Sequence, residues 1–178
     1  MEDTMLKSVL FITSILTGAN MAAAETTEHP TRIEIETYID LPYAAESIWQ
    51  VLVDLATYPE WNPYHVRVEG VAERGARLEV EVHKPNGHRL VIHPRVIVAE
   101  PDRSLVWGGG VPGIFRGVHR FDLEPLSENC TRLHHTEVFA GLFVGYAELG
   151  SIEAGYAAMN AALADRLASV SRALDEAC

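Results

Sequence analysis

Two histidines and a glutamate are the residues of this chain best suited to acid–base chemistry. Segment 115–139 reads FRGVHRFDLEPLSENCTRLHHTEVF, and its alternation predicts two β-strands joined by a turn. His119 shares a face with the large apolar residues of the first strand, and His135 and Glu137 share the apolar face of the second. Buried ionisable groups are costly unless they are hydrogen-bonded or line a wet cavity. This sheet face is therefore predicted to border a ligand chamber.

The pairing of the two strands follows from their apolar faces. With a turn at 125–129, we expect Phe121 to face Leu133 and His119 to face His135, with the glutamate one diagonal step from His119. A carboxylate beside an imidazole fixes its tautomer and raises its basicity, so the group could act as a general base. A structural hydrogen-bond network across the hairpin is the competing interpretation. No metal site is predicted, because a flat sheet face splays such ligands.

Charge and cysteine content narrow the function classes. The chain of 178 residues has a formal net charge of −11, which repels phosphate backbones, so no nucleic-acid partner is expected. It has two cysteines, Cys130 and Cys178, too few for a disulfide framework or a zinc site. Whether they pair is left open.

The N-terminus has the layout of a secretory signal peptide. Lys7 precedes an apolar run at 9–19, and small residues lead to Ala24. We expect residues 1–24 to be a signal peptide cleaved near Ala24, and residues 25–31 to be a polar leader. The mature protein would be periplasmic or secreted. It would keep no stable membrane anchor, because the run is short of the roughly 20 apolar residues that a span needs.

Residues 32–177 are predicted to form one α+β domain. Segment 32–40 alternates as a strand, 44–55 has helical spacing, and 57–64 is expected to be a loop rich in aromatic residues and proline. Further strands are expected, before the hairpin, at 66–71, 78–83, 88–99 and 105–107. A long helix at 150–177 carries an apolar stripe of Ile152, Tyr156, Met159, Leu163, Leu167, Val170 and Leu174. The predicted fold is a curved antiparallel sheet of about seven strands around this C-terminal helix, with two short helices after the first strand.

Several short motifs occur in an order that resembles a known superfamily. They are AAESIWQVLVD (44–54), YPEWNP (58–63), PDRSLVW (101–107), GVHRF (117–121), EVFAG (137–141) and GYAAMNAAL (155–163). Together they resemble the START-related, polyketide cyclase and lipid-transport superfamily (SRPBCC). The resemblance covers essentially all of residues 33–174. It implies a helix-grip fold with a hydrophobic tunnel, a fold that hosts ligand carriers, hormone receptors, aromatic-polyketide cyclases and cochaperone modules, so fold alone leaves function open.

Two functions remain from different classes. The first is an exported protein that binds or carries a hydrophobic or aromatic small molecule; the second is a cyclase or dehydratase that uses His119 or His135 as a base and Glu137 as its orienter. A structural or protein-interaction module is a third, weaker possibility. No cofactor is expected, and the oligomeric state is open. The predicted ligand-binding residues are Trp61, Asn62, Trp107, Phe115, Phe121, Phe139, Tyr156, Met159, Asn160 and Leu163.

Overall fold

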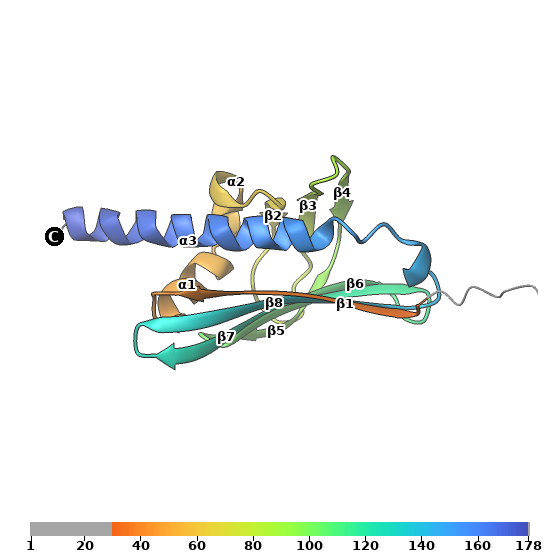
Figure 1. Cartoon of the computed structure of the whole chain (residues 1–178), viewed down its shortest axis with the longest axis horizontal. Helices are drawn as coiled ribbons and strands as arrows, with labels where there is room; N and C mark the ends of the chain where they lie inside the picture. The colour runs from red at the N-terminus through yellow and green to blue at the C-terminus, as the bar shows by residue number, and fades with distance from the viewer. Residues whose placement is uncertain (1–29, 178) are drawn as a thin grey trace, which may run out of the picture.

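A five-stranded antiparallel sheet forms one layer of the protein, and a long C-terminal helix lies across it (Figure 1). The computed structural model describes residues 30–177, with side chains to residue 172. The expected signal peptide, 1–24, and most of the expected leader lie outside the described residues. Within 30–177 the predicted α+β class, antiparallel sheet and terminal helix are confirmed.

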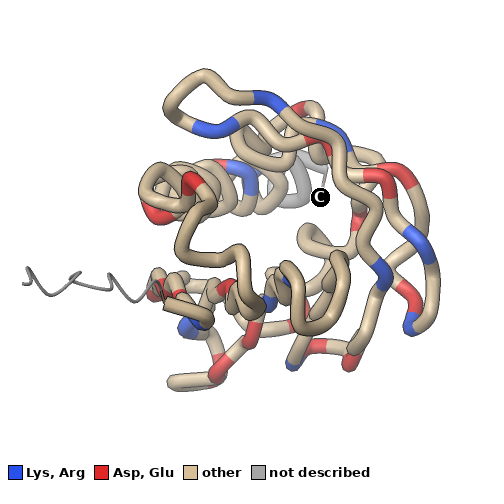
Figure 2. Tube along the Cα trace, turned by 90° about the vertical axis from the view of Figure 1, so that its right-hand side faces the viewer, with Lys and Arg blue, Asp and Glu red and all other residues tan. Residues whose placement is uncertain are grey.

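The strands form two sheets. The main sheet has the order β1-β8-β7-β6-β5, from strands Arg32–Leu41 (β1), Cys130–Ala140 (β8), Phe115–Ser127 (β7), Ser104–Val111 (β6) and Arg95–Glu100 (β5). The smaller one has the order β2-β3-β4, from His65–Glu69 (β2), Glu79–His83 (β3) and Arg89–Ile92 (β4). Within the described residues, acidic and basic positions occur on both sheets and on the helices (Figure 2).

Proline explains why the described chain has eight strands where the sequence predicted about seven. The segment expected to be one strand at 88–99 divides into β4 and β5 around Pro94. Proline has no N–H to give to a ladder, so a strand usually stops there. The chain leaves the smaller sheet at this point and enters the main sheet.

Two short helices follow β1, as predicted: α1 (Ala45–Val53) and α2 (Tyr58–Trp61), joined by the 3₁₀ turn η1 (Leu55–Thr57). The expected loop at 57–64 is thus partly helical. α1 buries Ile48 and Leu52 completely, at helical spacing. These helices close one end of the space between the sheet and the terminal helix.

The terminal helix α3 (Ile152–Ala177) packs against β1. Its predicted stripe is buried from Ile152 to Leu167, whereas Val170 is 37% exposed. The reason is visible in Figure 1, where the last turns of α3 project beyond the end of the sheet. Among the described residues, no helix is long and apolar enough to span a bilayer.

The predicted hairpin forms with the expected faces but with a different register. Phe121 faces His135, and His119 faces Glu137, so the predicted pairs Phe121 with Leu133 and His119 with His135 are wrong by two residues. The cause is the turn: β7 continues past Pro125, and a register shift between Pro125 and Ser127 precedes the pair of Ser127 with Cys130. A shift of two residues keeps every side chain on its predicted face.

Gly155 allows a close contact between α3 and Tyr64, the residue that precedes β2. A Cβ at this position would lie 2.2 Å from Cδ2 of Tyr64, whose ring is buried. Glycine to alanine within a helix ordinarily stabilises by about 1 kcal/mol. Here we expect Gly155→Ala to lower the free energy of unfolding by about 1–3 kcal/mol, the usual cost of overpacking, measured by urea denaturation.

The matched control is Gly150→Ala. An added Cβ there meets one atom within 4 Å, Oε1 of Glu148 at 3.8 Å, and we expect a change within about 0.5 kcal/mol. A Gly155→Ala protein as stable as the wild type would show that α3 does not pack on Tyr64 in this way.

Candidate functional site

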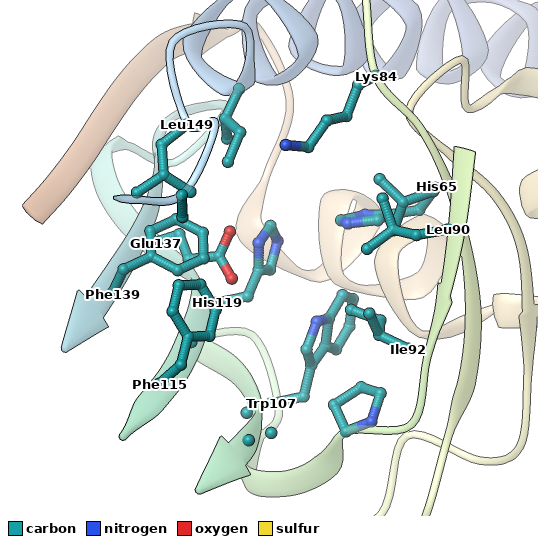
Figure 3. Close-up of a pocket in the computed structure, with 18 of the residues that line it drawn as sticks. His65, Lys84, Leu90, Ile92, Trp107, Phe115, His119, Glu137, Phe139 and Leu149 are labelled. Atoms are coloured by element: carbon teal, nitrogen blue, oxygen red, sulfur yellow. The ribbon is translucent and has the colours of Figure 1, made fainter. Parts of the chain in front are cut away.

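A cavity of about 490 Å³ lies between the main sheet, the smaller sheet and the segment that leads into α3 (Figure 3). Its volume is in the range of sites for small organic molecules. Aromatic and aliphatic side chains form most of its wall. The apolar members are Tyr64, Val82, Leu90, Val91, Ile92, Pro94, Trp107, Phe115, Phe139, Ala147, Leu149 and Ile152.

Glycines leave room for this cavity along two adjacent strands. Gly108, Gly109 and Gly110 lie in β6, and Gly117 lies in β7; all four line the cavity. A Cβ at Gly117 would lie 2.9 Å from Oε1 of Glu137. A glycine within a strand often marks a close approach of this kind, so the sequence carried a signal for this wall.

A hydroxyl group connects the predicted histidine and glutamate. The Tyr156 side chain, from α3, donates a hydrogen bond to Oε2 of Glu137, and its oxygen lies 3.1 Å from Nδ1 of His119. With Glu137 ionised, the Tyr156 proton is directed to the carboxylate, so Nδ1–H of His119 is the donor to the Tyr156 oxygen. His119 of β7 and Glu137 of β8, which were predicted to interact, are therefore joined through Tyr156 of α3.

Burial sets the charge of these groups. It raises the pKa of Glu137 to about 7, an effect that the hydrogen bond from Tyr156 and the positive charge of Lys84 partly oppose. It lowers the pKa of His119 well below its ordinary value, and the neighbouring histidines act in the same direction. The Glu137 side chain keeps some accessible surface, and this surface faces the cavity. Near neutral pH the carboxyl group, not the imidazole, is the group able to exchange a proton.

His135 belongs to a separate network behind the cavity. Its Nδ1 lies 2.8 Å from Oδ1 of Asn160, Nδ2 of Asn160 donates to Oγ1 of Thr37 at 3.0 Å, and Thr37 donates to the His135 carbonyl at 3.4 Å. This closed ring ties β1, β8 and α3 together. Burial lowers the pKa of His135 to about 3, partly opposed by the bond to Asn160. The structural interpretation fits His135 better than a catalytic one.

His65 completes a group of buried imidazoles. Its ring centroid lies 4.9 Å from that of His119, and the centroids of His119 and His135 are 4.8 Å apart. Burial lowers the pKa of His65 to about 3. Trp107 stacks on His119 at 5.0 Å with an interplanar angle of 8°. Within residues 30–177, no three His, Cys, Asp or Glu side chains are placed to share a metal ion.

The predicted site residues divide between the cavity wall and the core behind it. His119, Glu137, Trp107, Phe115 and Phe139 line the cavity. The other six on the sheet and on α3 do not: Tyr156 reaches it only through the groups it bonds, and Phe121, His135, Met159, Asn160 and Leu163 are core residues. The alternation of a strand predicts which sheet face a residue lies on, but it cannot separate cavity-lining residues from core residues, because both lie on the same face of the main sheet.

Trp61 and Asn62, predicted to contact ligand, lie away from the cavity wall. The Asn62 side-chain oxygen accepts hydrogen bonds from the backbone N–H groups of Tyr64 and His65, at 3.0 and 2.9 Å. This turn ends α2 and begins β2. Asn62 thus acts on the site only by positioning these two cavity residues.

Two charged residues at the cavity were not predicted. Nζ of Lys84 lies 3.0 Å from Oε2 of Glu148 and also donates to the Glu148 carbonyl oxygen. Nδ2 of Asn86 donates to the same carboxylate oxygen at 2.7 Å. These bonds join the β3–β4 turn to the segment before α3. Lys84 and Glu148 are 64 positions apart in the sequence. No local sequence pattern signals such a distant pair.

Comparison with known proteins agrees with this architecture. Residues 32–174 match the family model described as polyketide cyclase / dehydrase and lipid transport. A curated relative, the cysteine–tRNA ligase of Afipia carboxidovorans, is 33% identical over 79 residues, which is 44% of this chain. The chain spans only 17% of the length of that protein.

Solved structures share the fold at low sequence identity. A START superfamily protein from Mycobacterium smegmatis has a TM-score of 0.60 and 17% identity, covering 77% of this chain and 98% of that one. The Zhui aromatase/cyclase of a Streptomyces species has a TM-score of 0.62 and 17% identity, covering 76% and 93%. A Thermus thermophilus protein has a TM-score of 0.64 and 15% identity, covering 78% and 99%. At these identities the likeness shows the fold.

Proposed function

Because the chain belongs to the polyketide cyclase / dehydrase and lipid transport family, we propose that it binds a hydrophobic or aromatic small molecule in the cavity and acts as a carrier. The observation that carries this proposal is the aromatic wall beside the Glu137 carboxyl group. A ligand would place its ring or chain among Trp107, Phe115 and Phe139, and its polar group against Glu137. This is the usual division of labour in small-molecule sites.

Binding without chemistry is favoured by the state of the imidazoles. The pKa of His119 is held well below its ordinary value, so at neutral pH it has little tendency to take a proton from a ligand. His135, the other predicted base, is bonded to Asn160 outside the cavity wall. We therefore propose Glu137 as a ligand contact at the cavity rather than as the orienter of a histidine base.

A second candidate function is proton transfer by Glu137. The chain Glu137–Tyr156–His119 is hydrogen-bonded throughout, and a carboxyl group with a pKa of about 7 can both give and take a proton near neutrality. In such an enzyme Glu137 would be the acid–base group, and Tyr156 would transmit the charge change to His119.

Native mass spectrometry of the protein purified from its own host tests the proposal. We expect a co-purifying small molecule that is lost when Leu90, at the cavity and 39% exposed, is replaced by tryptophan to fill the space. A carrier releases that molecule unchanged after incubation. Conversion to a product that differs in mass or in chromatographic retention, abolished by Glu137→Gln, would instead establish the enzyme. Absence of any bound molecule would count against both functions.

Export is part of the proposal. It is supported by the signal-like segment 1–24. The protein purified from the host for mass spectrometry also tests it, because its N-terminal sequence should begin at or near Glu25. Full-length protein confined to the cytoplasm would contradict export while leaving the binding proposal intact.

A further inference from the structure

The charged side chains at the cavity differ in whether they have an ion-pair partner. Apart from the histidines and Tyr64, three ionisable side chains line it: Lys84, Glu137 and Glu148. Lys84 is paired with Glu148, whose carboxylate also accepts from Asn86. The side chain of Lys84 is 13% exposed, so this cation is largely buried with its counterion already in place. Little of its charge is left to attract an anionic ligand.

Glu137 has no such partner. Its bonded neighbour is the neutral hydroxyl of Tyr156, and no cation within residues 30–172 forms an ion pair with it. Figure 3 shows its carboxylate at the cavity beside Phe115, Phe139 and His119, with the Lys84 side chain extending into the same space. The charge of Lys84 favours the ionised form of Glu137, but the lysine is bonded to Glu148. Oε1, the oxygen that Tyr156 does not bond, lies over Gly117, where there is no side chain to cover it.

The surroundings of this carboxylate favour a cation over other ligands. With Glu137 ionised, one positive and two negative groups leave the cavity with one net negative charge, which repels carboxylates and phosphates. The two buried histidines at the wall, His65 and His119, have lowered pKa values and add no positive charge near neutral pH. Aromatic faces attract ammonium groups, and Trp107, Phe115 and Phe139 supply such faces. A buried carboxylate of this kind is best compensated by an opposite charge.

We propose that the cavity selects hydrophobic molecules that carry an ammonium group, and that this group pairs with Oε1 of Glu137 between the aromatic rings. The inference rests on the proposed binding function and names its ligand class. It also assigns Glu137 as the residue that determines specificity.

Proton release on binding provides a separate test of the same assignment. The pKa of Glu137 is about 7, so the carboxyl group is partly protonated near neutrality. A bound cation stabilises the ionised form. Binding of an amine at pH 6.5 should therefore release a proton to the buffer, whereas binding of a neutral ligand should not. Calorimetry in two buffers of different ionisation enthalpy measures this release.

Three probes with the same ring system test the ligand class: naphthylethylamine, naphthylethanol and naphthylacetate. By isothermal calorimetry at pH 7.5 we expect the amine to bind at least about 10-fold more tightly than the alcohol, and the acetate to bind most weakly. Glu137→Gln should weaken the amine by about 10-fold or more and change the alcohol by less than about 3-fold. The control Glu153→Gln, on an exposed residue of α3, makes the same change in net charge and should keep the amine preference.

The outcomes separate this inference from the proposed function. If the alcohol or the acetate binds the wild type as tightly as the amine, the ligand class is wrong and the binding function stands. The same holds if Glu137→Gln keeps the preference. If none of the three binds the wild type, the binding function fails as well. The wild-type ranking decides the question even if Glu137→Gln does not fold.

Discussion

Lowering the pH from 7.5 to 5 is expected to reduce the free energy of unfolding by at least about 2 kcal/mol. The cause is the group of buried histidines. His65 and His135 have pKa values of about 3 in the folded protein and about 6.5 when unfolded, so below pH 6.5 the unfolded chain binds more protons. Each of these two histidines therefore lowers the free energy of unfolding by about 2 kcal/mol at pH 5. His119 shifts in the same direction.

Glu137 offsets part of this loss. Its pKa is about 7 when folded and 4.5 ordinarily, so the folded protein takes up a proton as the pH falls and gains about 2 kcal/mol by pH 5. This contribution is complete below pH 4.5 and is lost as the pH rises through 7. The two histidines with values near 3 together outweigh the one carboxyl group, so the net effect is destabilising.

Urea denaturation of two variants at both pH values tests the assignment. His65→Phe keeps a ring against Trp107 and His119 but cannot titrate, so the loss should shrink by about 2 kcal/mol. His134→Gln is the control: His134 lies on the other face of β8, between Glu36 and Glu124, and its pKa is raised by its bond to Glu124. That variant should keep the full loss or enlarge it slightly, because a raised pKa adds stability as the pH falls. Equal pH dependence in His65→Phe and wild type would show that His65 is already solvated.

The sequence predicts which sheet face each residue of β7 and β8 lies on, but not the register in which the two strands pair. The alternation in β7 and β8 put His119, His135 and Glu137 on the inner face, and the structure confirms that face. The predicted register is wrong because the turn was expected at 125–129, whereas β7 continues past Pro125 with a register shift before Ser127 pairs with Cys130. Which strand residue faces which depends on such local turn chemistry.

The division between core and cavity could not be predicted for a different reason. Phe121 and Phe139 have the same pattern in the sequence, yet Phe121 is enclosed by rings and Phe139 lines the cavity. The cavity lies where β4 and the segment before α3 stand away from the main sheet. That separation depends on distant contacts such as Lys84 with Glu148, which no short-range periodicity encodes.

The same contrast leads to the largest effect that we expect from a single substitution. Phe121 is 1% exposed, and its ring centroid lies 4.6 Å from those of His119 and His135 and 5.5 Å from that of Trp107. Phe121→Ala should lower the free energy of unfolding by about 3–5 kcal/mol, because it removes a buried ring and leaves a void that its neighbours cannot fill. Urea denaturation at neutral pH measures the change.

Tyr38→Ala is the matched control, an aromatic residue on the opposite face of the same sheet. Tyr38 is 65% exposed, and its main contact is the Arg132 guanidinium 5.0 Å from the ring centroid, so we expect a loss of at most about 1 kcal/mol. A change within about 0.5 kcal/mol for Phe121→Ala would place that ring in solvent. The inner face of β7 would then be turned outward, and His119, which alternates with Phe121 along the same strand, would turn outward with it.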